Sequence, residues 1–151
     1  MTEPPDSHSP SIEVADDQSS VPVDAGWIRA LAERTLRALG IGGALSITLV
    51  EPGAMAELKE RALGVREPTD VLAWPMDIVE PSPGPFVIGD VVLCPSVAAD
   101  QARAAGKPFE DELALLLVHG ILHCASRDHA EPDQERAMFA EQDELLAAVR
   151  A

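Results

Sequence analysis

Three of the four histidines in this 151-residue chain lie close together, at positions 119, 123 and 129. His119 and His123 are four residues apart, so on a helix their rings would project from one face. His129 follows six residues later, beyond a short segment that should turn the chain and bring a third ring back. Three neutral imidazoles bind zinc and leave a fourth coordination position for water, as in catalytic zinc sites. The spacing therefore predicts one Zn²⁺ per chain, held by His119, His123 and His129.

A purely structural role for these histidines is the alternative interpretation. A single histidine on an apolar helix face is usually a core residue whose ring nitrogens have found hydrogen-bond partners. Two histidines at this spacing on a wholly apolar helix are harder to explain, because each ring needs partners for both nitrogens or suffers the cost of desolvation. A metal site is therefore the favoured interpretation.

The same spacing also occurs in other zinc enzymes, but their remaining motif residues are missing here. The metzincin proteases have the pattern H-E-x-x-H-x-x-G-x-x-H, in which the glutamate is the general base. Gly120 stands at that glutamate position. The H-x-E and P-C-x-x-C pair of the zinc base deaminases is absent as well. The sequence therefore argues against a peptidase and against a base deaminase.

The helix that would carry His119 and His123 spans residues 110–125. Its first residues are acidic, which favours a helix N-terminus, and the apolar run 113–118 leaves no polar face, so protein should surround it. Strands are predicted at 44–50, 71–74 and 86–93, with further helices beginning near Asp24, Pro52, Pro95 and Pro132. Because helices and strands mix without a regular βαβ repeat, we predict an α+β fold. A small mixed sheet would pack against several helices, with a buried central helix carrying the two metal-ligand histidines.

Residues 1–24 differ in composition from the rest of the chain. They contain four prolines, several serines and six acidic residues, with no lysine or arginine. Low hydrophobicity with charge of one sign is typical of disordered segments. We therefore predict a disordered acidic tail over residues 1–24 and a single metal-dependent hydrolase domain over residues 25–151.

The overall composition excludes several classes of protein. The formal net charge is −15, from 11 basic and 26 acidic residues. A diffusely basic nucleic-acid binder is excluded, because affinity for phosphates comes largely from lysine and arginine, although a local cationic groove stays compatible. Two cysteines are too few for a disulfide framework. No apolar run approaches the ~18 residues of a membrane span, and no signal peptide is recognisable. We expect a cytoplasmic protein without a membrane partner.

Two further motifs lie upstream of the histidines. They read PTDVLAWP at residues 68–75 and GDVVLC at residues 89–94. With these motifs in this order, residues 25–150 resemble the YbeY family, bacterial metal-dependent endoribonucleases that act in ribosomal RNA maturation and ribosome quality control. The resemblance implies zinc on His119, His123 and His129, with Thr69 and Asp70 beside the cleft. It also implies that the partner is RNA, either ribosomal RNA or the small ribosomal subunit, with no DNA expected.

The chain departs from the family pattern at four positions. Ser126 replaces a glycine that commonly ends the helix, where a positive φ would disfavour a side chain. Cys124 and Arg127 replace a leucine and an aromatic residue. Leu63 stands where many members have an arginine that is thought to face the substrate phosphate. Because the ligands are kept while their neighbours have changed, the resemblance implies metal binding more strongly than catalysis.

A mechanistic hypothesis follows for the remaining candidate residues. Zinc held by three imidazoles lowers the pKa of bound water toward ~7, which suits hydrolysis of an RNA phosphodiester. Arg66, or with less support Arg127, is the candidate cation beside the scissile phosphate. Asp128 is the candidate to orient a ligand imidazole, unless it is a turn residue bonded to its own backbone.

Two other functions stay open. One is a catalytically decayed, zinc-binding, ribosome-associated protein, which the residues at positions 63, 126 and 127 would support. The other is a metal hydrolase of a small anionic substrate, which an acidic surface favours because it repels RNA at long range.

Overall fold

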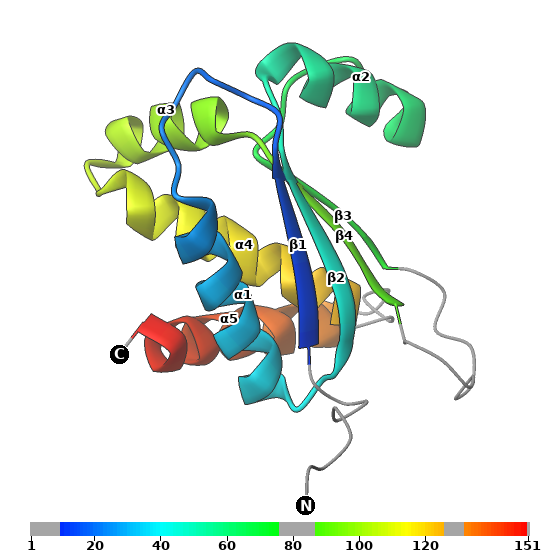
Figure 1. The fold of residues 1–151 in the computed structure, drawn as a ribbon, viewed down its shortest axis with the longest axis vertical. Coiled ribbons are helices and arrows are strands. Elements are labelled where there is room, and N and C mark those ends of the chain that lie inside the picture. Colours follow the sequence, from blue (N-terminus) through cyan, green and yellow to red (C-terminus); the bar gives the residue numbers. More distant parts are fainter. Residues whose placement is uncertain (1–9, 76–86, 126–131, 151) are drawn as a thin grey trace, which may run out of the picture.

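A four-stranded mixed sheet with helices on both faces organises the chain (Figure 1). This computed structural model describes residues 10–75, 87–125 and 132–150, with the side chains of residues 132–139 excepted. The strand order is β1-β2-β4-β3, in which β1 (Pro10–Asp16) runs parallel to β2 (Gly43–Leu49) and β2 runs parallel to β4 (Val87–Leu93). The edge strand β3 (Val71–Pro75) is antiparallel to β4. The mixed sheet confirms the predicted α+β class.

Five helices connect and cover these strands in the described part of the chain. They are α1 (Ala25–Leu39), α2 (Pro52–Leu63), α3 (Pro95–Ala105), α4 (Phe109–Ala125) and α5 (Pro132–Arg150). Local chemistry fixes several of their ends. The Asp24 carboxylate accepts hydrogen bonds from the backbone N–H groups of Gly26 and Trp27, and so caps α1. Gly40 ends the same helix in the left-handed conformation, at φ 70°.

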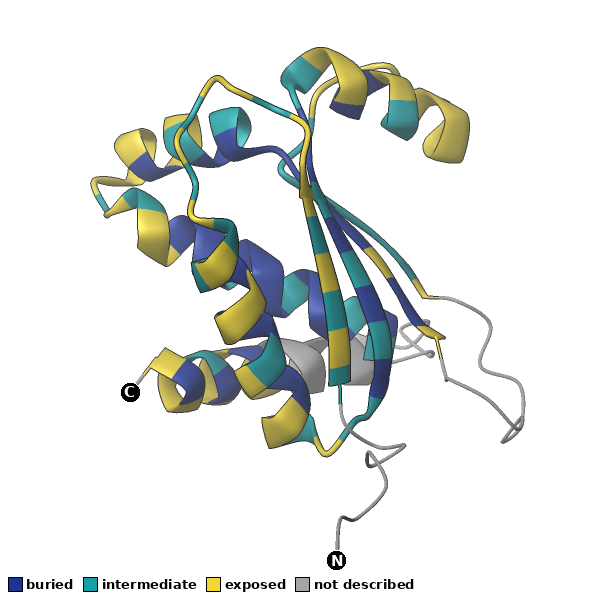
Figure 2. Ribbon diagram, in the orientation of Figure 1, coloured by how far each residue is buried: buried dark blue, intermediate teal, exposed yellow. Residues whose placement is uncertain are grey.

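The main hydrophobic core lies between the sheet and the layer formed by α1, α4 and α5. Alternate residues of β2 are buried in it, among them Ile47 and Leu49. The same core contains Leu31 of α1 and Leu117 of α4. In Figure 2 the buried residues follow α4 and the sheet, whereas α2 is mostly exposed or half-buried. The prediction that protein surrounds the helix at 110–125 is confirmed. Glu112, its one buried carboxylate, pairs with Lys107 at 3.2 Å.

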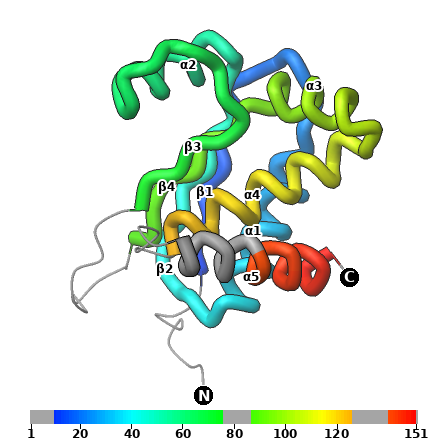
Figure 3. The backbone as a smooth tube through the Cα atoms, turned by 180° about the vertical axis from the view of Figure 1, so that it is seen from behind, coloured from blue at the N-terminus to red at the C-terminus, as the bar shows by residue number. Residues whose placement is uncertain are grey.

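A second, smaller core lies beneath α2 on the opposite face of the sheet. Its buried members are Val50, Met55, Val92 and Cys94. The view from behind in Figure 3 separates α2 from the layer that contains α4, α1 and α5. The helix with the two histidines therefore packs on one face of the sheet, and α2 packs on the other.

The predicted disordered tail is wrong for residues 10–24. Residues 10–16 form β1, which pairs with β2 over seven positions. Ile12 and Val14 are half-buried against the core, while their neighbours Ser11 and Glu13 are exposed. This alternation is typical of a strand, but the acidic composition of the segment favoured a prediction of disorder. Hydrogen bonds also anchor the following segment, including one of 2.6 Å from Ser20 Oγ to Glu51 Oε1. The folded unit therefore includes residues on the N-terminal side of 25, and residues 1–9 lie outside the described part.

Across the described residues, no helix combines the length and apolarity needed to cross a bilayer.

Candidate metal centre

His119 and His123 project from α4 toward the edge strand β3. Their Nε2 atoms lie 2.9 Å apart, and their rings meet edge to face at 76° with centroids 4.4 Å apart. Both residues line a recess of about 200 Å³, whose other walls are Gly120 and residues 71–73 of β3. The predicted common face of the two histidines is confirmed, and the recess brings them against residues 71–73 of the first upstream motif.

The other ring nitrogen of His119 is held from behind by α5. His119 Nδ1 lies 2.6 Å from the side-chain oxygen of Gln142, which is buried at 6% exposure. An amide oxygen only accepts hydrogen bonds, so Nδ1 must carry the proton. In the neutral ring, His119 Nε2 is then the nitrogen with the lone pair, and it receives the N–H of His123 Nε2.

These two residues fit the zinc ion that the sequence predicts. Imidazole is a common zinc ligand, and two nitrogens bound at about 2.0–2.1 Å in a tetrahedral site lie roughly 3.4 Å apart. The observed 2.9 Å between the Nε2 atoms is within a small side-chain adjustment of that separation. Among the described residues, no set of three or more His, Cys, Asp or Glu side chains could hold a metal. His129 lies outside the described residues, so the three-histidine ligand set stays a prediction.

Gly120 explains why this helix can approach the sheet so closely. A β-carbon at Gly120 would lie 2.8 Å from Cγ1 of Val91 and 3.3 Å from Cγ2 of Val71, closer than side chains normally approach. The strands β3 and β4 therefore occupy the space that a glutamate at position 120 would need. A metzincin-like glutamate therefore has no room at position 120. The same close approach of α4 to the sheet brings β3 against the two histidines.

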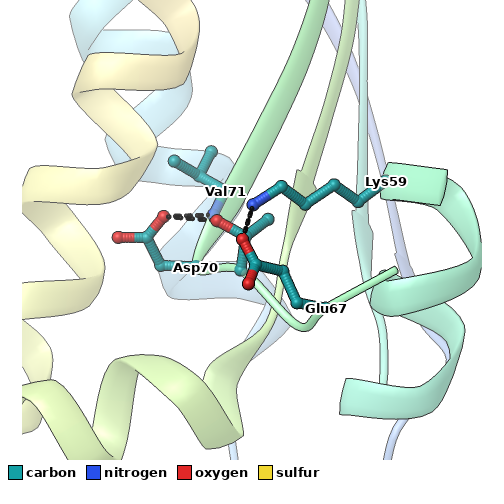
Figure 4. A network of polar contacts seen from close by, with 5 residues as sticks. Lys59, Glu67, Asp70 and Val71 are labelled. Atoms are coloured by element: carbon teal, nitrogen blue, oxygen red, sulfur yellow. Dashed lines mark hydrogen bonds and ion pairs between the residues drawn. The ribbon is translucent and has the colours of Figure 1, made fainter. Parts of the chain in front are cut away.

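Asp70 fixes the start of the strand that forms the recess wall. Its carboxylate accepts a hydrogen bond of 2.7 Å from the backbone N–H of Val71, and its carbonyl accepts one of 3.0 Å from the N–H of Cys94. Figure 4 shows this carboxylate with its hydrogen bond to Val71, and the same view contains the ion pair in which Lys59 Nζ lies 2.8 Å from Glu67 Oε1. Asp70 therefore stands immediately before the first residue of β3. Because Val71 lines the recess, Asp70 is also one residue from the candidate site.

Comparison with known proteins then settles the family. The family model described as endoribonuclease YbeY matches residues 12–150, which is nearly the whole chain. The chain belongs to the YbeY endoribonuclease family. Proteins named endoribonuclease YbeY from Salinispora tropica and Acidothermus cellulolyticus are 47% and 49% identical to it. Each alignment covers 93% of this chain, and the two cover 97% and 92% of the respective relative.

Another relative and a solved structure agree with this assignment. The Mycobacterium tuberculosis protein named endoribonuclease YbeY is 44% identical, over 90% of this chain and 81% of its own length. A solution structure from Thermotoga maritima is similar with a TM-score of 0.66 at 26% identity, covering 92% of this chain and 89% of that one. The YbeY match begins at residue 12, inside β1, which agrees with the corrected start of the folded unit.

Two of the positions singled out on the basis of the YbeY resemblance lie near the end of α2. Leu63, in place of the arginine seen in many members, is 63% exposed. Arg66 is exposed, and its guanidinium is paired with two carboxylates of α2, at 2.8 Å from Glu60 and 3.9 Å from Glu57. The hydrogen bond and the charge of Glu60 raise the pKa of Arg66. Arg66 does not line the recess beside the histidines, so its role toward a phosphate stays a prediction.

Cys124 points away from the two histidines. Its thiol lies 3.8 Å from the carbonyl oxygen of Asp90 and packs against Gly89 of β4. Burial, with a smaller contribution from the charge of Asp90, raises the pKa of Cys124 to about 12. The other candidates near the YbeY histidine motif, Ser126, Arg127 and Asp128, lie outside the described residues.

Among the described residues, the walls of the recess are mostly apolar. None of its described lining residues is a lysine, arginine, aspartate or glutamate. Six of the described basic side chains instead pair with carboxylates elsewhere on the surface. Among the described residues, sequence reasoning missed the contact between Gln142 and His119, because a lone glutamine in an amphipathic helix has no local pattern that relates it to a histidine 23 residues away.

Proposed function

We propose that this chain is a zinc-dependent endoribonuclease that cuts single-stranded RNA segments in ribosomal RNA maturation and ribosome quality control. Its substrate would be ribosomal RNA, free or in the small ribosomal subunit. One Zn²⁺ per chain would be bound by His119, His123 and His129. Membership of the YbeY family supports the nuclease activity, and the convergence of two imidazoles on one recess supports the metal.

The observation that carries the proposal is the short distance between the Nε2 atoms of His119 and His123, which line the same recess. Bound zinc supplies a water of lowered pKa and a Lewis acid for a phosphoryl oxygen. The chain itself supplies the rigid support. Helix α4 fixes both histidine backbones, and β3 provides an apolar wall through Val71 and Ala73. A neutral recess would admit an RNA backbone without the local carboxylate repulsion that the net charge of −15 would otherwise suggest.

The test is cleavage of defined RNAs by zinc-loaded protein. A single-stranded RNA and a hairpin of equal length are incubated at low salt with the wild type, His119→Ala and His123→Ala. We expect cleavage of single-stranded segments by the wild type and a loss of at least about 100-fold in both variants. His8→Ala removes the remaining histidine of the chain and is the matched control, with activity expected to equal that of the wild type.

A catalytically decayed, zinc-binding, ribosome-associated protein is the second candidate. The apolar, exposed Leu63 favours it, because an arginine at this place in many YbeY members would add positive charge. Stoichiometric zinc with no cleavage of either RNA would support this candidate. Hydrolysis of a small phosphodiester without cleavage of RNA would instead favour a hydrolase of small anionic substrates.

A further inference from the structure

Gln142 is an unusual residue for the interior of this protein. It lies on α5, and among the described residues only Thr35, Glu112 and Gln142 are buried polar or charged side chains. Thr35 bonds to the carbonyl of Leu31 in its own helix, and Glu112 pairs with Lys107. Gln142 differs from both because its side-chain partner is a candidate metal ligand, His119, at 2.6 Å.

The surrounding contacts hold Gln142 firmly in place. Leu145 and Val149, three and seven residues later, are buried in the main core and so share a face of α5 with Gln142. Arg150 then ties the end of α5 to the start of α4, with its guanidinium 3.1 Å from Asp111 and 5.9 Å from the ring centre of Trp27. The glutamine therefore comes from a helix that is anchored beyond the site, which lets its amide act as a fixed hydrogen-bond acceptor.

A fixed acceptor decides which nitrogen of a neutral histidine is available to a metal. The hydrogen bond of one ring nitrogen determines whether the other carries the lone pair. Because Gln142 accepts from Nδ1, the lone pair of His119 is on Nε2, and Nε2 is the atom that faces His123 and the recess. An uncharged amide does this without placing a further buried negative charge beside the ring.

We infer that Gln142 is a positioning residue, which locks His119 in the Nδ1–H tautomer and orients its Nε2 for zinc. This inference rests on the proposed metal site. Helix α5 would then contribute to that site, although none of the predicted ligands comes from α5. Outer partners of metal-bound histidines commonly affect metal affinity by 10–100-fold. The same range is expected for the loss of the Gln142 amide.

The test compares four variants of the full-length chain. Gln142→Met keeps the length of the side chain and removes the acceptor, whereas Gln142→Glu keeps an acceptor oxygen. Gln142→Asn stays polar but withdraws the acceptor by one methylene, and it serves if the Met variant does not fold. Leu145→Ala is the matched control, because it weakens the packing of the same helix and leaves the Gln142 amide intact.

Two measurements are made on each variant. Long-range ¹H–¹⁵N correlation spectra of the histidine rings, recorded on chelator-treated protein, report the tautomer of His119. Competition with a chromogenic chelator reports zinc affinity. We expect the Nδ1–H tautomer in the wild type, Gln142→Glu and Leu145→Ala. In Gln142→Met and Gln142→Asn we expect a shift toward the Nε2–H tautomer, with zinc binding 10–100-fold weaker.

The outcomes separate this inference from the proposed function. An unchanged tautomer and unchanged zinc affinity in folded Gln142→Met or Gln142→Asn would overturn the role of Gln142. An equal loss of zinc affinity in Leu145→Ala would also overturn it, because loose packing alone would then explain the effect. Failure of the wild type to bind zinc would refute the proposed metal site, while the ring spectra would still show whether Gln142 sets the tautomer.

Discussion

Gly120 of α4 lies so close to Val91 of β4 that a β-carbon on the glycine would be 2.8 Å from the valine Cγ1 atom. The helix that carries both candidate ligands is thus seated on the sheet at a residue with no side chain. The distance from His119 and His123 to the β3 wall depends on this contact, because the recess is lined by Gly120 together with residues 71–73.

Gly120→Ala should destabilise the fold, although alanine is the better helix former. Overpacking of a core usually costs about 1–3 kcal/mol, and the higher helix propensity of alanine offsets at most about 1 kcal/mol of that. Gly53 in α2 is the matched control, because nothing lies within 4 Å of a β-carbon there. Gly53→Ala should leave stability unchanged or raise it by up to about 1 kcal/mol. Urea unfolding measures both variants, and equal stability of the two would contradict the close contact.

Val14→Ser tests the strand that replaces the predicted tail. Val14 is half-buried against the core, so its loss should lower the free energy of unfolding by about 1–2 kcal/mol. The adjacent Glu13 is exposed, and Glu13→Ser should change stability by no more than about 0.5 kcal/mol. Chemical denaturation compares the two. No effect from either substitution would mean that residues 10–16 do not pair with the sheet.

The Cys124 thiol should make stability depend on pH above neutrality. Its pKa is 9.0 when unperturbed and about 12 in the folded protein, because burial disfavours the thiolate. The folded state therefore keeps a proton that the unfolded state releases, and the stabilising effect is complete below pH 9 and lost between pH 9 and 12. Urea midpoints of wild type and Cys124→Ala should converge as pH rises through this window. A constant difference between them would contradict the burial of this thiol.

Arg66→Gln tests the predicted cation near the substrate phosphate. Removal of a group that stabilises developing charge commonly slows catalysis by about 100-fold or more. Zinc content should not change, because Arg66 does not line the histidine recess. Arg103→Gln is the control, since Arg103 is also exposed and paired with a carboxylate, that of Asp100 on α3. If RNA cleavage rates of the two variants are equal, Arg66 has no special role.

The positions of the secondary-structure elements could be predicted because they depend on local chemistry. Asp24 caps the N-terminus of α1 and Gly40 ends this helix, and both residue types are typical of those positions. Pro52 begins α2 and Gly64 ends it in the same way. The shared face of His119 and His123 follows from helical spacing in the same way. The buried state of α4 followed from its lack of a polar face.

The features that could not be predicted depend on contacts between distant segments. Strand β1 was missed because acidic residues surround Ile12 and Val14, and its pairing with β2 involves residues more than thirty positions away. The reason for glycine at position 120 is the proximity of Val91, which no spacing in the sequence reveals. The contact from Gln142 to His119 likewise depends on how α5 packs on α4.

The most direct test of the metal centre is the zinc content of purified protein measured by elemental analysis. The wild type and His8→Ala should each contain about one zinc per chain, and His119→Ala and His123→Ala should contain almost none, because three-ligand zinc sites rarely tolerate loss of an imidazole. Full zinc occupancy in both His119→Ala and His123→Ala would show that these rings do not bind the metal, and would contradict the proposed centre.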